Sequence, residues 1–82
     1  MKTKVYFNDL QERSQRVIIS QELASQNNGT MPAVNNLTIG PSPYADEPDC
    51  QLITADTEIG TWLLVWSATD KEFNTIMKEN QK

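Results

Sequence analysis

Residues 61–67 form the densest apolar run of the chain, and this run limits the possible folds more than any other feature. Read as a β-strand, it places both tryptophans and Leu64 on one face of a sheet, with Leu63 and Val65 on the other, because side chains alternate along a strand. A strand with one face in water would alternate apolar and polar residues. We therefore expect a central strand covered on both sides, by helices on one face and by a long loop or a second subunit on the other.

The length of 82 residues indicates one domain, close to the lower limit for a core that folds without a metal, a disulfide or a partner. A core of this size makes homo-oligomers an expectation. Cys50 has no second cysteine to pair with, and the chain does not open on a basic segment followed by an apolar one, so the sequence predicts a cytoplasmic location. The longest apolar run, 62–66, is far shorter than the roughly 20 residues that cross a bilayer, and no membrane partner is expected.

The formal net charge of -4 is concentrated in the middle of the chain. Residues 46–58 contain several carboxylates and no lysine or arginine. Affinity for nucleic acid depends on clustered basic side chains. Direct binding of nucleic acid is therefore not expected.

The remaining pattern predicts an α+β fold. Residues 2–7 alternate as a strand, and Asn8 suits the cap of a helix that runs to about residue 26. Residues 51–54 form a strand that a turn joins to the apolar run, so the expected order is strand, helix, optional strand, strand, strand, helix. We expect a single domain over residues 1–82, with a small antiparallel sheet of three to four strands and two helices packed mainly on one face.

The first predicted helix is apolar on two sides. At about 100° per residue, Leu10, Val17 and Ala24 share one side. Ile19 and Leu23 lie on the opposite side. We expect the first set to cover the sheet, which leaves Ile19 and Leu23 for a partner or for the following loop. The β-branched residues in this segment also suit a strand, and that alternative stays open.

Residues 27–49 hold all four prolines and two of the three glycines, so no helix runs through them. Leu37 and Ile39 alternate with polar neighbours and suit a short edge strand. A connection of this length in a small domain is uncommon and is usually functional or disordered. Tyr44 either pins this loop to the core or is an exposed contact residue, and the sequence slightly favours the pin.

The last element carries the strongest local signal. Thr69 and Glu72 have the spacing of a capping box, in which each side chain bonds the other residue's backbone N–H group. A helix from Asp70 to about residue 80 is the prediction. Its buried stripe would be Phe73, Ile76 and Met77.

Catalytic and metal-binding groups are scarce in this composition. The chain has no histidine, which removes the common nucleophile arrangements, the common zinc sites and the usual base at neutral pH. Cys50 has no second cysteine with which to share a metal. The sequence predicts a protein that is not an enzyme and that carries no cofactor or metal.

The acidic segment is the best candidate for a site. Its carboxylates, beside a proline-rich loop and an aromatic residue, would complement a basic groove on another protein. The predicted partner-binding residues are Tyr44, Asp46, Glu47, Asp49, Asp56 and Glu58. This pattern favours a small accessory or inhibitor protein of the phage or mobile-element type, whose target has a basic surface. A nucleic-acid-handling protein is one candidate for that target.

Two other interpretations stay open. The acidic segment is also what a small protein needs simply to remain dispersed in water. Alternatively, the protein is a structural or assembly protein that self-associates through Ile19 and Leu23, or through an open face of the sheet.

Overall fold

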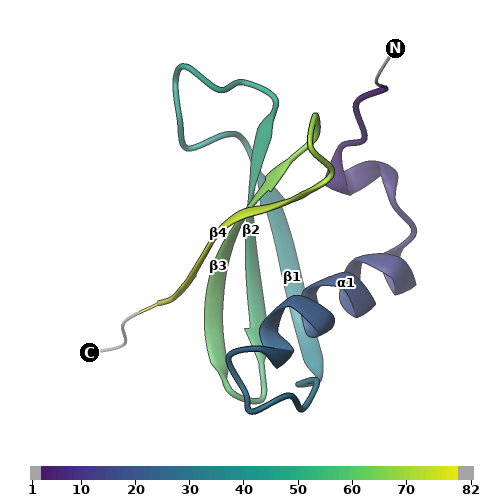
Figure 1. Cartoon of the computed structure of the whole chain (residues 1–82), viewed down its shortest axis with the longest axis vertical. Coiled ribbons are helices and arrows are strands. Elements are labelled where there is room, and N and C mark those ends of the chain that lie inside the picture. Colours follow the sequence, from purple (N-terminus) through teal and green to yellow (C-terminus); the bar gives the residue numbers. More distant parts are fainter. Residues whose placement is uncertain (1–2, 80–82) are drawn as a thin grey trace.

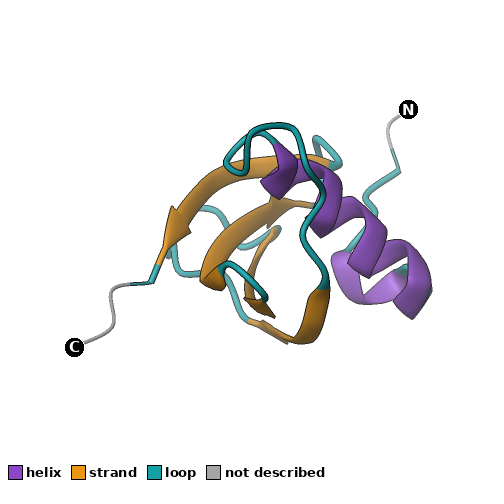
Figure 2. Ribbon diagram, turned by 90° about the horizontal axis from the view of Figure 1, so that it is seen from below, coloured by secondary structure: helices purple, strands orange, loops and turns teal. Residues whose placement is uncertain are grey.

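The structure is a computed structural model that describes residues 3–79. A 3-10 turn, η1 (Phe7–Asp9), and a helix, α1 (Glu12–Ala24), precede four strands, which are β1 (Val34–Gly40), β2 (Cys50–Thr57), β3 (Gly60–Ser67) and β4 (Glu72–Lys78). The strands form one antiparallel sheet in the order β1-β2-β3-β4 (Figure 1). The sheet is strongly curved, and α1 packs against its concave side (Figure 2). The α+β class is confirmed, with one helix in this part of the chain.

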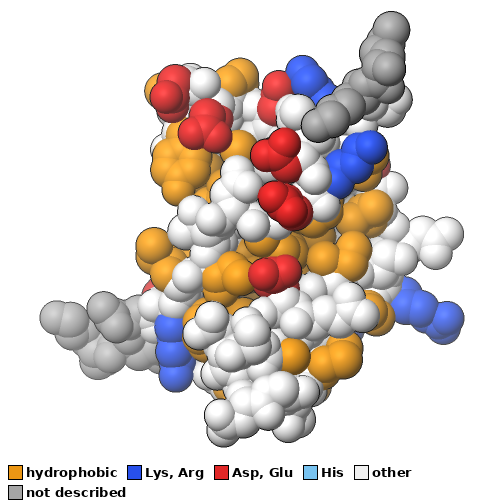
Figure 3. Space-filling model, viewed as in Figure 1, with side chains coloured by type: hydrophobic (Ala, Val, Ile, Leu, Met, Phe, Trp, Pro, Cys, Tyr) orange, Lys and Arg blue, Asp and Glu red, His pale blue; other side chains and the backbone are white. Residues whose placement is uncertain are grey.

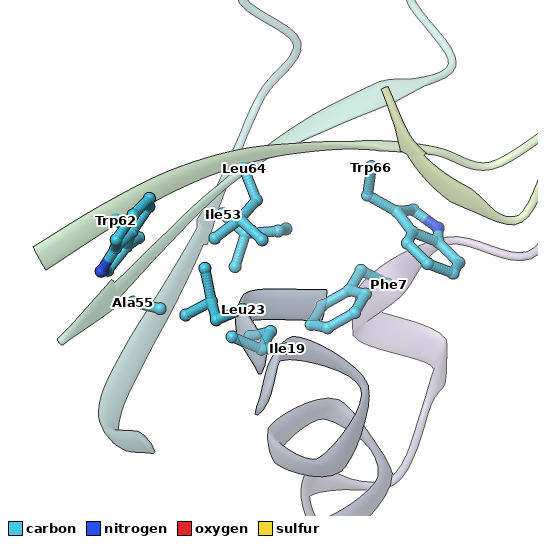
Figure 4. Packing of buried hydrophobic residues seen from close by; sticks show 8 residues of the cluster. All are labelled: Phe7, Ile19, Leu23, Ile53, Ala55, Trp62, Leu64 and Trp66. Atoms are coloured by element: carbon cyan, nitrogen blue, oxygen red, sulfur yellow. The ribbon is translucent and has the colours of Figure 1, made fainter. Parts of the chain in front are cut away.

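The predicted central strand is confirmed as β3, which pairs with β2 on one side and β4 on the other. Its three alternate residues on the α1 side, Trp62, Leu64 and Trp66, are buried as expected. They join side chains from η1, α1 and β2 in one core (Figure 4). The members of this core are Phe7, Ile19, Leu23, Ile53, Ala55, Trp62, Leu64 and Trp66.

The orientation expected for the helix is wrong. Ile19 and Leu23 are 0% exposed and point from α1 into the core, whereas Val17 is 42% exposed (Figure 4). Polar residues on the same side of the helix as Ile19 and Leu23 explain why this side faces the core. The Gln15 amide donates to the carbonyls of Phe7 and Leu10, at 2.9 and 3.0 Å, and the hydroxyl of Ser20 donates to the carbonyl of Pro32. These bonds hold that side inward, so Ile19 and Leu23 form no free surface.

The strand expected at 2–7 is also wrong, and Lys2 lies outside the described residues. Residues 3–6 are not part of the sheet, and Phe7 begins η1. The Phe7 ring packs against the rings of both Trp66 and Phe73, with ring centroids 5.2 and 5.6 Å away. The Gln51 side chain accepts a hydrogen bond from the Phe7 N–H group at 2.6 Å. Ring packing by Phe7 and its hydrogen bond to Gln51 therefore hold this segment against the core, in place of pairing with a strand.

The second predicted helix is wrong as well, because its residues form β4. A turn with Lys71 at φ 60° takes the place of the capping box. The pairing of β4 with β3 contains a bulge, so that Phe73 faces Trp66 and Ile76 faces Leu64. The bulge puts two residues three apart on the same face, and this is also the spacing that a helix would give. The predicted end of this helix, at residue 80, lies outside the described range.

Residues 27–49 are only partly loop. The short edge strand expected near Leu37 is the seven-residue β1, which pairs with β2. β2 itself extends beyond the expected 51–54 at both ends. Residues 41–49, hereafter the 41–49 loop, then connect β1 to β2 and position the candidate site.

Candidate protein-binding surface

Within residues 3–79, no helix covers the face of the sheet opposite α1. We call it the open face. In the registered pairs it carries alternate residues of all four strands. Its central side chains are Leu52, Thr54, Leu63, Val65, Thr75 and Met77. The 41–49 loop covers this face only in part, because Met77 remains 53% exposed.

A pocket of about 220 Å³ lies between the open face and the 41–49 loop. Leucine, valine and methionine side chains form its floor, and Pro43 and Tyr44 form its wall. The lining residues are Pro43, Tyr44, Leu52, Leu63, Val65, Thr75 and Met77. Tyr44 is 38% exposed, and its hydroxyl lies 3.5 Å from the hydroxyl of Thr75. Tyr44 therefore touches the sheet and also presents part of its ring to the solvent.

Local hydrogen bonds fix the shape of the 41–49 loop. The hydroxyl of Ser42 accepts from the N–H group of Tyr44 at 3.1 Å and donates to the carbonyl of Glu47 at 2.7 Å. The N–H group of Glu47 donates to the carbonyl of Tyr44 at 3.2 Å, and that of Cys50 donates to the carbonyl of Glu47 at 3.3 Å. One serine side chain thus supplies the closing contacts of a proline-rich turn, a role that serine often has.

Asp46 and Glu47 lie at the tip of this loop and are exposed. Neither carboxylate forms an ion pair within residues 3–79, and Glu47 receives only a long contact of 3.6 Å from the thiol of Cys50. Where the loop appears in Figure 3, acidic side chains lie directly beside hydrophobic ones. These two carboxylates and Tyr44 are the predicted site residues that the structure brings together.

Asp49 is part of the same loop, but its carboxylate is engaged. The Lys4 ammonium lies 2.8 Å from it, and the Tyr6 hydroxyl donates to it at 2.9 Å. The hydrogen bonds from Lys4 and Tyr6 hold the pKa of Asp49 below its usual range. The bond to Asp49 likewise raises the pKa of Lys4 and of Tyr6. Asp49 therefore holds the N-terminal segment to the loop.

Asp56 and Glu58 lie at the opposite end of β2, roughly 25 Å away along an extended strand. Asp56 is on the open face, where its carboxylate accepts a hydrogen bond from Thr61 at 2.9 Å. Glu58 lies in the turn between β2 and β3 and accepts from the N–H group of Ala33 at 3.1 Å. The acidic segment of the sequence is thus divided between two ends of the sheet.

The open face is negative as well as apolar. Glu72 and Asp56 lie near its two ends, paired with Ser67 and Thr61. None of the described strand residues on this face is a lysine or arginine. Lys78 pairs with Trp62, so its side chain belongs to the opposite face, where its stem lies against Gly60.

The open-face pocket was not predicted as a site, although its signal was present in the sequence. Leu63 and Val65 showed that β3 needs cover on its second face, and the 41–49 loop was a possible cover. Met77 was instead assigned to a buried helical stripe. The sequence does not predict the pocket because the 41–49 loop covers the open face only in part. How much of the face it covers depends on how the loop folds.

Residues 3–79 contain no group of three or more His, Cys, Asp or Glu side chains that could hold a metal ion. Within the same range, no helix has the length and apolar character needed to cross a membrane. Cys50 is buried, and its burial, followed by the nearby Glu47 carboxylate, raises the pKa of the thiol.

The fold and the surface together define a small α+β protein, in which a helix covers one face of a four-stranded meander and a loop partly covers the other. Comparison with known protein families, with curated proteins and with solved structures finds no match. A function is therefore inferred from the chemistry of the open face and the 41–49 loop.

Proposed function

We propose that this protein is a non-catalytic protein-binding module that engages a basic surface of its target through the 41–49 loop. The observation that supports this proposal is the grouping of Tyr44, Asp46 and Glu47 on one fixed loop beside an exposed apolar face. The two carboxylates supply charge, and the tyrosine ring supplies an anchor. Tyrosine is common at the energetic centres of interfaces.

Charge and shape have different roles in such a contact. Exposed carboxylates speed the encounter with a basic surface and select against acidic ones, while the apolar contact slows dissociation. The fixed loop loses little conformational freedom on binding, which reduces the entropic cost of association. A small acidic protein of this kind fits the role of an accessory or inhibitor protein of a phage or mobile element, acting on a nucleic-acid-handling protein.

The test begins by capturing partners from host lysate on the immobilised protein, eluting them with salt and identifying them by mass spectrometry. Binding of the purified partner is then measured by calorimetry at several salt concentrations. We expect the double variant Asp46→Asn, Glu47→Gln to lower affinity about tenfold and to flatten the salt dependence, because exposed ion pairs contribute about 0.2–1 kcal/mol each.

The chain offers a matched control for this experiment. The double variant Asp56→Asn, Glu58→Gln removes the same charge at the distant end of β2, and we expect it to bind almost as the wild type does. Unchanged affinity and salt dependence in the Asp46, Glu47 variant would refute a role for the loop carboxylates.

Self-association is a second candidate, favoured by the 53% exposure of Met77 on the open face. Two copies packed through this face would cover the apolar pocket of each. Ile19 and Leu23 would not contribute, because both are in the core. Sedimentation distinguishes the candidates. A dimer that resists salt, and that Met77→Lys converts to a monomer, would support self-association.

A further inference from the structure

We infer that the pocket between Tyr44 and the open face receives one large aliphatic or aromatic side chain of the partner, which lysine or arginine residues flank. This inference rests on the proposed function and specifies the partner's chemistry. It describes a short basic segment with a single apolar residue at its centre.

The size of the pocket limits the occupant. Its volume of about 220 Å³ lies below the roughly 300–1,000 Å³ of pockets that hold drug-sized ligands. A single side chain therefore suits it better than a free organic molecule does.

The lining selects an apolar occupant. Leu52, Leu63, Val65 and Met77 offer only hydrocarbon and a thioether. The two polar groups of the lining, the hydroxyls of Tyr44 and Thr75, lie 3.5 Å apart and face each other. No lining residue is charged, so a buried charge would find no partner in this pocket.

The surroundings of the pocket select basic neighbours. Asp46 and Glu47 follow Tyr44 on the same loop, and Glu72 lies on the open face at the start of β4, the strand that contributes Thr75. The described strand residues of this face include no basic side chain that would offset these charges. Lysine or arginine residues beside the anchor would meet this negative potential.

Two larger hollows next to β1 have a different chemistry. One, of about 370 Å³, includes Glu12, Gln15 and Arg16 in its lining. The other, of about 430 Å³, includes Asn8 and Gln51. Both linings mix polar or charged groups with apolar ones, whereas the lining of the open-face pocket is almost wholly apolar, so the open-face pocket is the best apolar anchor site of the three.

The test uses capped five-residue peptides as probes and the methyl NMR signals of Met77, Leu63 and Val65 as the readout. One peptide is glycine-arginine-leucine-lysine-glycine, a second has serine in place of leucine, and a third has glutamate in place of arginine and lysine. We expect the first peptide to shift these signals at millimolar concentration. The serine peptide should bind roughly tenfold to a hundredfold more weakly, because it lacks the buried side chain. The glutamate peptide should also bind more weakly.

A pair of variants locates the binding. Thr75→Phe fills the pocket from the sheet, whereas Thr38→Phe adds the same ring to an exposed position on β1 that belongs to the open face but does not line the pocket. We expect Thr75→Phe to abolish binding of the leucine peptide, and any residual binding should keep the same salt dependence. Thr38→Phe should leave binding intact. Tryptophan fluorescence and thermal unfolding verify that both variants are folded.

The outcomes separate this inference from the proposed function. If Thr75→Phe binds the leucine peptide as the wild type does, or if the serine peptide binds equally well, the pocket is not the anchor site, while the loop carboxylates can still bind a basic partner. If Thr75→Phe abolishes binding but the Asp46, Glu47 variant keeps its affinity and salt dependence, the proposed function and the basic flanks are refuted. Shifts that depend on protein concentration without peptide would show that a second copy occupies the pocket, which overturns the inference.

Discussion

Trp62 and Trp66 lie two residues apart on the same face of β3, but their indole N–H groups differ. That of Trp66 donates to the carbonyl of Val5 at 2.8 Å. That of Trp62 is buried and has no acceptor within residues 3–79. In Figure 4 the Trp62 nitrogen lies on the side of its ring that faces away from the other labelled residues. Alternation predicted that both rings would be buried, but it could not predict hydrogen bonds, because the Val5 acceptor comes from a segment 61 residues away.

This difference predicts unequal effects of the same substitution. Trp66→Phe and Trp62→Phe each remove one ring of an indole, but only Trp66→Phe breaks a hydrogen bond. We expect Trp66→Phe to lower the free energy of unfolding by about 1–2 kcal/mol more than Trp62→Phe, because a bond is lost and a carbonyl loses its donor. Urea unfolding of both variants measures this, and equal losses would contradict it.

At the scale of elements, the sequence predicts a strand well where its apolar residues or its neighbouring turn define how it packs. β3 was predicted because it is apolar on both faces, and β2 because it pairs through a short turn. The residues of β4 were assigned to a helix for two reasons, the capping spacing of Thr69 and Glu72 and the helical spacing of Phe73 and Ile76. The bulge in β4 produces the spacing of Phe73 and Ile76. The backbone hydrogen bonds to β3 outweigh the capping preference of Thr69 and Glu72. Long-range pairing of this kind overrides local preference.

The turn before β4 gives a direct test of this balance. Lys71 has φ 60°, a conformation that costs a residue with a side chain roughly 1–2 kcal/mol. We expect Lys71→Gly to raise the free energy of unfolding by about 0.5–1 kcal/mol, since glycine removes this strain but loses more entropy on folding. Lys71→Val removes the same charge but should destabilise, because a β-branched residue is strongly disfavoured at positive φ. Thermal unfolding compares the two. A stabilising valine would show that the turn adopts another conformation.

At the scale of the whole molecule, residues 4–6 are attached to the 41–49 loop through a cluster formed by Lys4, Tyr6 and Asp49. The N–H group of Val5 also donates to the carbonyl of Ala68, and that of Ala68 donates to the carbonyl of Asp49, each at 2.9 Å. The N-terminal segment, the end of β3 and the loop therefore meet at one end of the sheet. The sequence predicts Asp49 as a partner-binding residue, because nothing in the local pattern shows that Lys4 reaches it.

The cluster predicts a pH dependence of this attachment. The pKa of Asp49 is lowered, so its contribution is present above its unfolded pKa and is lost as pH falls through the folded pKa. The pKa values of Lys4 and Tyr6 are raised, so their contributions are lost as pH rises through their folded values. We expect the attachment to be strongest between roughly pH 5 and 10. The protection factor of the Val5 amide, which is the exchange rate of an unstructured peptide divided by that of this amide at the same pH, measures it, and Asp49→Asn should remove the loss at acidic pH. A protection factor that does not fall with acid in the wild type would exclude the cluster as the cause.

The burial of Cys50 makes this protein convenient to label. Its thiol is the chain's only one, and its raised pKa and burial protect it from maleimides at neutral pH. A cysteine introduced at the exposed Ala45 would then react selectively and place a dye between Tyr44 and the two loop carboxylates. The fluorescence of that dye would report directly on contacts at the loop, without removing any native thiol.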